Sequence, residues 1–128
     1  MDAVYIFKKD HSPLPLAGLY SEWTNPETHG KLLTFSIVTT TGNELLSKIH
    51  NNPKLKEARM PVILHEELAD HWLAKLEGEK DKKLIQELIQ EYPQEELEAY
   101  TVGKLRGKEY LGNVPEISEP VKYAELEF

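Results

Sequence analysis

The sequence of 128 residues contains no cysteine. A chain without thiols forms no disulfide, offers no thiolate to a metal ion and supplies no cysteine nucleophile. No apolar run reaches the roughly 18 residues that a membrane-spanning helix needs, and the first residues lack the pattern of a signal peptide. We therefore expect a soluble, cytoplasmic protein with no membrane partner.

Basic residues are in the minority, with 15 Lys and Arg against 22 Asp and Glu and a formal net charge of −7. Proteins that bind nucleic acid usually carry an excess of positive charge, because contacts with phosphates supply much of the affinity. The charge balance disfavours a nucleic-acid binder without excluding one, because the acidic residues concentrate in the C-terminal half. The length suits one domain, so we expect residues 1–128 to form a single domain.

Extended segments are expected where β-branched and aromatic residues gather, at residues 4–7, 14–23 and 32–39. The turns between these three segments are short, which favours an antiparallel meander. Residues 60–64 are expected to be buried and extended, and residues 100–102 to form a last short strand.

Helices are expected at three places. Asn43 follows a glycine and can cap a short helix over residues 44–50. Leucine, isoleucine and tryptophan recur at helical spacing over residues 66–76 and 82–92. The tail from Gly112 onwards contains prolines and is expected to be irregular.

Several motifs of enzyme sites are incomplete. A zinc peptidase helix places two histidines four residues apart, whereas His65 and His71 are six apart and point to different faces. Residues 103–108 lack the Lys-Ser/Thr pair that grips phosphate and magnesium. The sequence therefore predicts no metal and no cofactor.

One block of the sequence, residues 37–64, has a specific order of elements. A strand ends in three threonines, a capped short helix follows and ends in histidine, and Arg-Met-Pro then begins a buried segment. This block resembles the SRAP family, the SOS-response-associated peptidases. Further matches to the family pattern lie at residues 15–23, 66–73, 100–102 and 111–114. The resemblance covers nearly the whole chain and corresponds to the C-terminal part of the family domain.

The resemblance implies a protein of the DNA damage response that binds single-stranded DNA at abasic sites. Family members begin Met-Cys-Gly-Arg, and an autopeptidase step removes the methionine. The exposed cysteine then captures the abasic aldehyde as a thiazolidine crosslink. Here residue 2 is Asp2, and the family's catalytic glutamate motif and Asn-x-Arg strand are also missing. We therefore expect this chain alone to be inactive.

Three residues match functional positions of the family. His50 corresponds to the active-site histidine, whose imidazole suits proton transfer near neutral pH. Thr39 and Arg59 correspond to positions that line the DNA groove, where a hydroxyl and a guanidinium suit phosphate oxygens. Each has a plainer interpretation: His50 as a cap of helix carbonyls, Thr39 as a strand-end hydroxyl and Arg59 as a surface ion pair.

Two further residues are less specific. Trp23 suits stacking on a base, although a tryptophan at a strand end is more often part of a core. Glu22 resembles the family's catalytic glutamate in its local sequence, but the order of elements favours a structural or rim role.

The predicted fold is α+β, with a curved, antiparallel, barrel-like sheet and peripheral helices. An incomplete sheet exposes edges that another copy can cover, so we expect a homo-oligomer, paired through residues 4–7 or 16–20. Two functional interpretations stay open: a piece of an active SRAP protein, or a non-catalytic stand-alone module for DNA or protein interaction. A Met-Cys-Gly-Arg start encoded upstream of Met1 would favour the first. A small acidic interaction protein unrelated to the family is the third alternative.

Overall fold

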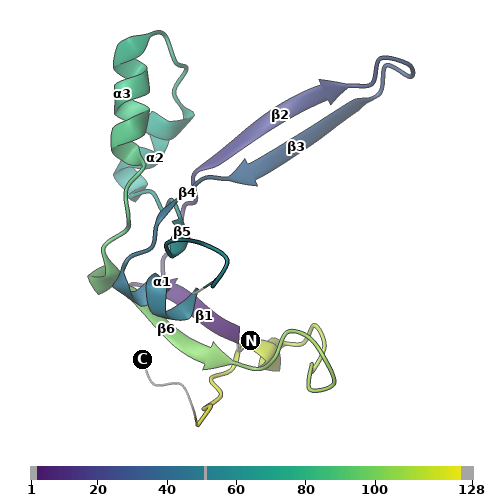
Figure 1. Cartoon of the computed structure of the whole chain (residues 1–128), viewed down its shortest axis with the longest axis vertical. Coiled ribbons are helices and arrows are strands. Elements are labelled where there is room, and N and C mark those ends of the chain that lie inside the picture. The colour runs from purple at the N-terminus through teal and green to yellow at the C-terminus, as the bar shows by residue number, and fades with distance from the viewer. Residues whose placement is uncertain (1–2, 51, 125–128) are drawn as a thin grey trace. The chain divides into compact units, whose positions relative to one another are not determined.

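The computed structural model describes residues 3–50 and 52–124 (Figure 1). Its helices and strands follow one another in this order: β1 (Ala3–Lys8), β2 (Gly18–Thr24), β3 (Lys31–Ile37), β4 (Thr39–Thr41), α1 (Glu44–Ile49), β5 (Arg59–Pro61), α2 (Glu66–Leu73), α3 (Glu79–Leu88), η1 (Gln94–Glu96), β6 (Leu97–Val102) and η2 (Pro115–Ser118). The described strands pair as three two-stranded antiparallel sheets, β1–β6, β2–β3 and β4–β5. Helices combined with antiparallel sheets confirm the predicted α+β class, whereas a barrel-like sheet stays a prediction.

The chain forms two compact units, which we describe one at a time. One unit is the continuous stretch Leu14–Tyr92, and the other combines Met1–Pro13 with Pro93–Phe128. The larger unit contains the block with the three predicted site residues. No described helix is long and apolar enough to cross a membrane.

The larger unit is organised around a small core at the base of the β2–β3 hairpin. Its buried members come from three parts of the unit: Ala17, Val62, Leu64 and Leu88. The partly buried apolar residues packed against them lie mainly on α2 and α3 and include Trp72. The indole Nε1 of Trp72 also donates a hydrogen bond to the carbonyl of Gly18 over 3.0 Å, which fixes α2 to the first residue of β2. Figure 1 shows the rest of the hairpin extending away from α2 and α3.

The predicted meander is wrong at its first strand. β1 pairs with β6, with Tyr5 opposite Tyr100, and not with the strand that follows it in sequence. The rings of Tyr5 and Tyr100 stack with centroids 5.4 Å apart, so aromatic contact accompanies this distant pairing. Adjacency in sequence predicts local hairpins and gives no signal for a partner strand that lies about ninety residues away.

The second and third predicted strands are shorter than expected, because the chain changes partners at two points. Residues before Gly18 bond to the segment after β5: the amide of Ala17 donates to the carbonyl of Val62, and the amide of Leu64 to that of Pro15. At Val38 the amide donates to Ala17 and the carbonyl accepts from Val62, which separates β3 from β4.

The helix predictions are confirmed in kind and corrected in extent. α1 has its predicted cap at Asn43, α2 ends at Leu73 instead of residue 76, and α3 covers Glu79–Leu88 instead of residues 82–92. α3 begins directly after Gly78, whose φ of 154° is outside the helical range. Its first turn carries acidic side chains, which interact favourably with the positive end of a helix dipole.

In the smaller unit, the β1–β6 pair is extended by the C-terminal segment. The tail is less irregular than predicted, because it contains η2 and then runs beside β6. The amide of Val121 donates to the carbonyl of Thr101 over 2.8 Å, and the Tyr123 hydroxyl donates to the carbonyl of Val102 over 2.8 Å. The hydroxyl of Tyr100 reaches the carbonyl of Ser118 over 3.1 Å.

Candidate functional site

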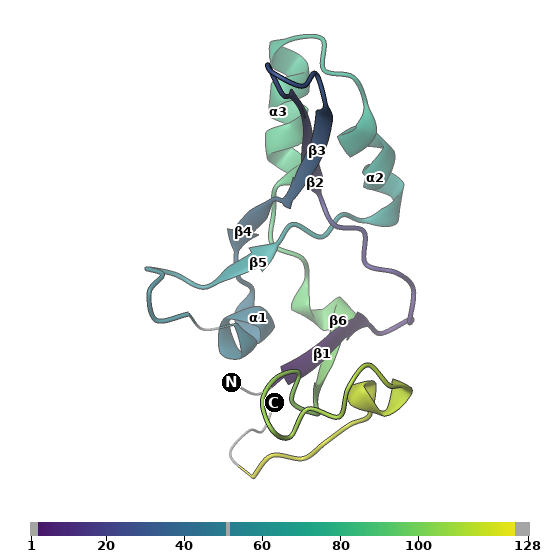
Figure 2. The same ribbon diagram turned by 90° about the vertical axis from the view of Figure 1, so that its right-hand side faces the viewer.

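The predicted site lies on the short β4–β5 ladder and the helix that follows β4. Thr39 is opposite Pro61 and Thr41 is opposite Arg59, so the two predicted groove residues stand on neighbouring strands. Figure 2 shows β4 and β5 side by side with α1 next to them. Met60 in the middle of β5 and Val62 directly after it are buried, and they anchor β5 in the larger unit.

The guanidinium of Arg59 joins the two strands at the surface. Its Nη2 donates to the carbonyl oxygen of Thr39 over 2.8 Å and to the Thr39 hydroxyl over 3.2 Å. Its Nη1 contacts the carboxylate of Glu57 over 3.3 Å. Arg59 is half-buried and Thr39 is exposed. The structure therefore brings Thr39 and Arg59 together, and it also contains the surface ion pair that is the plainer interpretation of Arg59.

Asn43 fixes the start of α1 against the rest of the unit. Its side-chain oxygen accepts a hydrogen bond from the amide of Leu46 over 2.9 Å, and its Nδ2 donates to the carbonyl of Tyr92 over 2.7 Å. Its backbone amide points at the sulfur of Met60, 3.4 Å away, and Asn43 itself is buried. One side chain thus connects the helix, β5 and the chain after α3.

Gly42 allows this close approach. A Cβ at this position would lie 3.1 Å from the hydroxyl oxygen of Ser47 and 3.3 Å from the Cβ of Ala58. The amide of Gly42 donates to the carbonyl of Ala58 over 2.8 Å, and the Ser47 hydroxyl donates to the carbonyl of Gly42 over 3.0 Å. The glycine before the cap therefore suits this close packing, because a Cβ would require Ser47 or Ala58 to shift by a few tenths of an ångström.

We expect Asn43→Ala to lower the free energy of unfolding by about 2 kcal/mol, as the sum of a lost helix cap and a lost buried hydrogen bond. Chemical denaturation followed by circular dichroism measures this change. Asn43→Ser is the matched control, because serine keeps an acceptor for the helix amide and should recover about 1 kcal/mol. Equal stability of Asn43→Ala and the wild-type chain would contradict the role assigned to this side chain.

His50 ends α1. Its backbone amide donates to the carbonyl of Leu46 over 2.7 Å, so the backbone of His50 does cap the helix. Its side chain is exposed, and its imidazole makes no hydrogen bond, ion pair or ring contact with the described residues. An accessible ring nitrogen is what a proton-transfer group requires. The described contacts do not join the imidazole to Thr39 or Arg59.

The other residues considered in the sequence, His65, His71 and Glu22, lie outside the group formed by Thr39 and Arg59. The His65 ring packs against the Tyr92 ring with centroids 4.9 Å apart, while His71 is exposed on α2. Glu22 forms an ion pair with Lys31 over 2.7 Å on the hairpin surface, in keeping with a rim position. Within residues 3–50 and 52–124, no group of three acidic or histidine side chains is arranged to hold a metal ion.

Two carboxyls with a lowered pKa belong to the smaller unit. Hydrogen bonds from the hydroxyl and amide of Ser12 hold the pKa of Asp10 below its ordinary value. The ammonium of Lys104 does the same for the pKa of Glu109. Both carboxyls are at the surface, and neither belongs to the candidate site.

Comparison with known proteins gives consistent matches. The sequence pattern of the SOS response associated peptidase (SRAP) family matches residues 2–108. The abasic site processing protein YoqW of Bacillus subtilis (strain 168) is 37% identical over 111 residues, and so is the protein of that name in Bacillus phage SPbeta. Each match covers 87% of this chain and 45% of the relative. The chain thus spans about half the length of the curated relatives it matches.

Solved structures have the same fold. A crystal structure of a protein from Bacteroides thetaiotaomicron matches with a TM-score of 0.71 and 28% identity, over 93% of this chain and 48% of that one. A second, from Bordetella bronchiseptica, matches with a TM-score of 0.65 and 22% identity, over 79% of this chain and 45% of that one. Because the family pattern extends through both units, including the block with His50, Thr39 and Arg59, the chain belongs to the SRAP family.

Proposed function

We propose that the chain is part of a protein that processes abasic sites in single-stranded DNA. The observation that carries this proposal is the 37% identity with YoqW, an abasic site processing protein, over 87% of the chain. An abasic site exposes an aldehyde on its deoxyribose. In the chemistry of the complete family domain, the amine of an N-terminal cysteine condenses with this aldehyde, releases water and gives an imine. The thiol then adds to the imine carbon and closes a thiazolidine.

The 128 residues contribute to this reaction without supplying its nucleophile, because they contain no cysteine. The exposed imidazole of His50 is suited to move protons as the imine forms or is hydrolysed. Arg59 has its guanidinium at the surface beside the Thr39 hydroxyl, where a phosphate oxygen can replace the Glu57 carboxylate as its partner. Loss of the initiator methionine by autopeptidase action likewise requires the cysteine-bearing part of the domain.

Two properties of the whole protein accompany this proposal. The β2–β3 and β4–β5 sheets of the larger unit are parts of a curved, barrel-like sheet in the complete domain, and the protein acts in the cytoplasm. Both statements concern the complete protein, because this chain spans about half the length of its relatives.

A second candidate is a non-catalytic module that keeps the fold for DNA or protein interaction. The large apolar surface of the β2–β3 hairpin favours it. In this case the chain would hold DNA or a protein partner with no covalent step.

Measurement of DNA affinity tests the proposed groove. We expect the chain to bind a labelled single-stranded oligonucleotide with a central tetrahydrofuran, an abasic analogue that lacks the aldehyde. Arg59→Ala should weaken binding about tenfold through the loss of one charge-assisted hydrogen bond. It should also reduce the slope of log affinity against log salt by about 0.7, the value for one phosphate contact on a single strand. Fluorescence anisotropy at several salt concentrations gives both quantities.

Lys82→Ala is the control for this measurement. Lys82 is an exposed cation paired with Glu79 on α3, as Arg59 is paired with Glu57, but it lies outside the candidate site. Its loss should leave the affinity and the salt slope unchanged. No binding by the wild-type chain, or equal effects of the two substitutions, would contradict a DNA contact at Arg59.

A further inference from the structure

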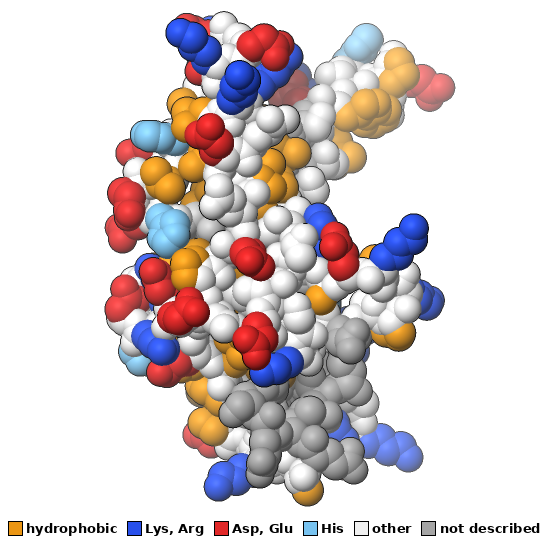
Figure 3. Space-filling model, turned by 60° about the vertical axis from the view of Figure 1, so that its left-hand side comes forward, with side chains coloured by type: hydrophobic (Ala, Val, Ile, Leu, Met, Phe, Trp, Pro, Cys, Tyr) orange, Lys and Arg blue, Asp and Glu red, His pale blue; other side chains and the backbone are white. Residues whose placement is uncertain are grey.

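The loop over residues 52–58, between α1 and β5, is a positively charged part of an acidic protein. From Lys48 to Arg59 the sequence contains four Lys and Arg side chains and one acidic side chain, a formal charge of +3, whereas the whole chain carries −7. In Figure 3 the loop projects at the middle right with Lys and Arg side chains on it, whereas acidic side chains are spread over much of the rest of this face. The candidate site therefore lies beside a local excess of positive charge.

Both ends of the 52–58 loop are fixed at the candidate site. The loop follows α1, which ends at His50, and leads directly into Arg59, the first residue of β5. The carbonyl of Ala58 accepts a hydrogen bond from the amide of Gly42 over 2.8 Å, which holds the second end of the loop against the chain before α1. Figure 2 shows the loop projecting between α1 and β5. A ligand bound at His50 and Arg59 would therefore lie next to this loop.

The first part of the loop has a defined turn. The side-chain oxygen of Asn52 accepts a hydrogen bond from the amide of Lys54 over 3.0 Å. The carbonyl of Asn52 accepts a second one from the amide of Leu55, also over 3.0 Å. Asparagine commonly stabilises turns by such bonds to its own backbone neighbours. The turn therefore fixes the backbone at the first lysine of the loop.

The two lysines of the loop are exposed and have no carboxylate partner among the described residues. The ammonium groups of Lys54 and Lys56 form no ion pair or hydrogen bond within that part of the chain. The other two cations of the segment are each paired with a carboxylate: Lys48 with Glu44 over 2.9 Å, and Arg59 with Glu57 over 3.3 Å. An unpaired ammonium can bind a phosphate without first losing a carboxylate partner, so these two lysines are suited to an anionic ligand.

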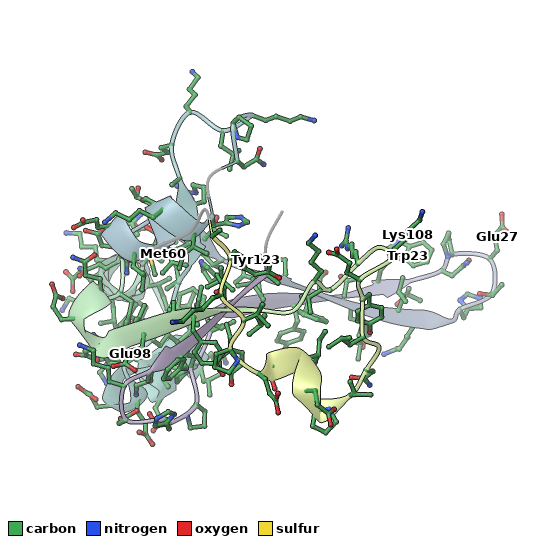
Figure 4. The ribbon with its side chains drawn as sticks, turned by 90° about the horizontal axis from the view of Figure 1, so that it is seen from below. Trp23, Glu27, Met60, Glu98, Lys108 and Tyr123 are labelled. Carbon is green, nitrogen blue, oxygen red and sulfur yellow. The ribbon has the colours of Figure 1, made fainter. Side chains whose placement is uncertain are left out.

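The loop is short enough to keep both lysines near Arg59. Lys56 precedes Arg59 by three residues and Lys54 by five, so their Cα atoms lie at most about 11 Å and about 18 Å from that of Arg59. Successive phosphates advance by about 3.4 Å along one strand of a DNA duplex. The lysines can therefore contact other phosphates than the one at Arg59. Figure 4 shows the loop extending away from Met60 and the packed part of the unit, where a long ligand has access to it.

We propose that Lys54 and Lys56 bind the phosphates that follow the one at Arg59 along a DNA strand. The loop thus extends the groove of Thr39 and Arg59 by two phosphate contacts. Such contacts supply affinity that does not depend on base sequence, as a protein that meets a site without a base requires. The inference rests on the proposed function and deepens it, because it identifies the residues that hold the strand on one side of the abasic site.

The salt dependence of DNA binding tests the inference. The double variant Lys54→Ala, Lys56→Ala is compared with the wild-type chain by fluorescence anisotropy, with the tetrahydrofuran oligonucleotide described above. We expect the slope of log affinity against log salt to fall by about 1.4, because each phosphate contact on a single strand contributes about 0.7. The same two contacts correspond to a loss of affinity of about tenfold at about 0.15 M salt. Circular dichroism should give the wild-type spectrum, because both side chains are exposed.

Two further variants separate a local contact from a general effect of charge. Lys54→Arg, Lys56→Arg retains both charges and should restore the wild-type salt slope. Lys80→Ala, Lys83→Ala removes two exposed lysines of α3, which likewise have no ion pair within the described part of the chain. Because α3 lies outside the candidate site, this second variant should bind with the wild-type affinity and slope.

The possible results distinguish this inference from the proposed function. If the alanine variant of the loop retains the wild-type slope while Arg59→Ala still weakens binding, the inference is overturned and the proposed function stands. Equal effects of the loop variant and the α3 variant would also overturn it, because binding would then follow net charge alone. If the wild-type chain binds no DNA, both the inference and the proposed groove are wrong.

Discussion

The 128-residue chain is expected to form no heat-stable covalent adduct with single-stranded DNA that carries an abasic site. A thiazolidine needs an amine and a thiol on the same residue, and the chain contains no thiol. The effect is all-or-none, since no other side chain closes this ring. Incubation with an abasic oligonucleotide, followed by heating and a denaturing gel, measures it.

Lysine imines are the background in this experiment. Lysine amines condense reversibly with aldehydes, so a band that appears only after borohydride reduction reports an imine and leaves the prediction intact. A short peptide that begins with cysteine is the positive control for thiazolidine formation. A heat-stable band from the chain without reductant would contradict the prediction and would require a different crosslinking residue.

Local features were predictable from the sequence, because each depends on residues close together in the chain. The cap at Asn43 and the helix after it follow from a short polar side chain before an apolar pattern. The burial of Met60 and Val62 follows from an apolar run after a polar loop. In the same way, the resemblance to the SRAP family was carried by a continuous block and is confirmed by the family match.

Pairing across long distances was not predictable. Nothing near Tyr5 in the sequence indicates Tyr100 as its partner, and the break at Val38 depends on hydrogen bonds to Ala17 and Val62 from two other segments. The contact of Arg59 with Thr39 was not predictable for the same reason, because it depends on the pairing of β4 with β5. The roles of His50, Thr39 and Arg59 in chemistry stay predictions.

The exposed hairpin is the clearest case of information that the sequence alone does not contain. From the sequence alone, a core could cover either face of these two strands. The sequence predicts that Trp23 belongs to a core or stacks on a base. In the described structure neither face has a partner, and Trp23 is half exposed. The register is what reveals that apolar side chains occupy both faces.

Substitution of His50 is expected to slow crosslinking about 100-fold, within the range of general acid–base catalysis. The test needs a complete domain, so this chain replaces the matched part of YoqW in a single-chain chimera. His50→Ala removes the imidazole but keeps the backbone hydrogen bond from residue 50 to Leu46. Because the side chain is exposed, the free energy of unfolding should change by no more than about 0.5 kcal/mol.

Time courses on denaturing gels, measured from pH 5.5 to 8.5, separate a proton-transfer role from a structural one. Loss of a proton-transfer group should change the pH dependence of the rate as well as lower the rate. His71→Ala is the matched control, because His71 is also an exposed histidine at the end of a helix. It should leave rate and pH profile unchanged. If His50→Ala lowers stability without changing the pH profile, or matches His71→Ala in rate, then His50 is only the helix cap that its backbone already forms.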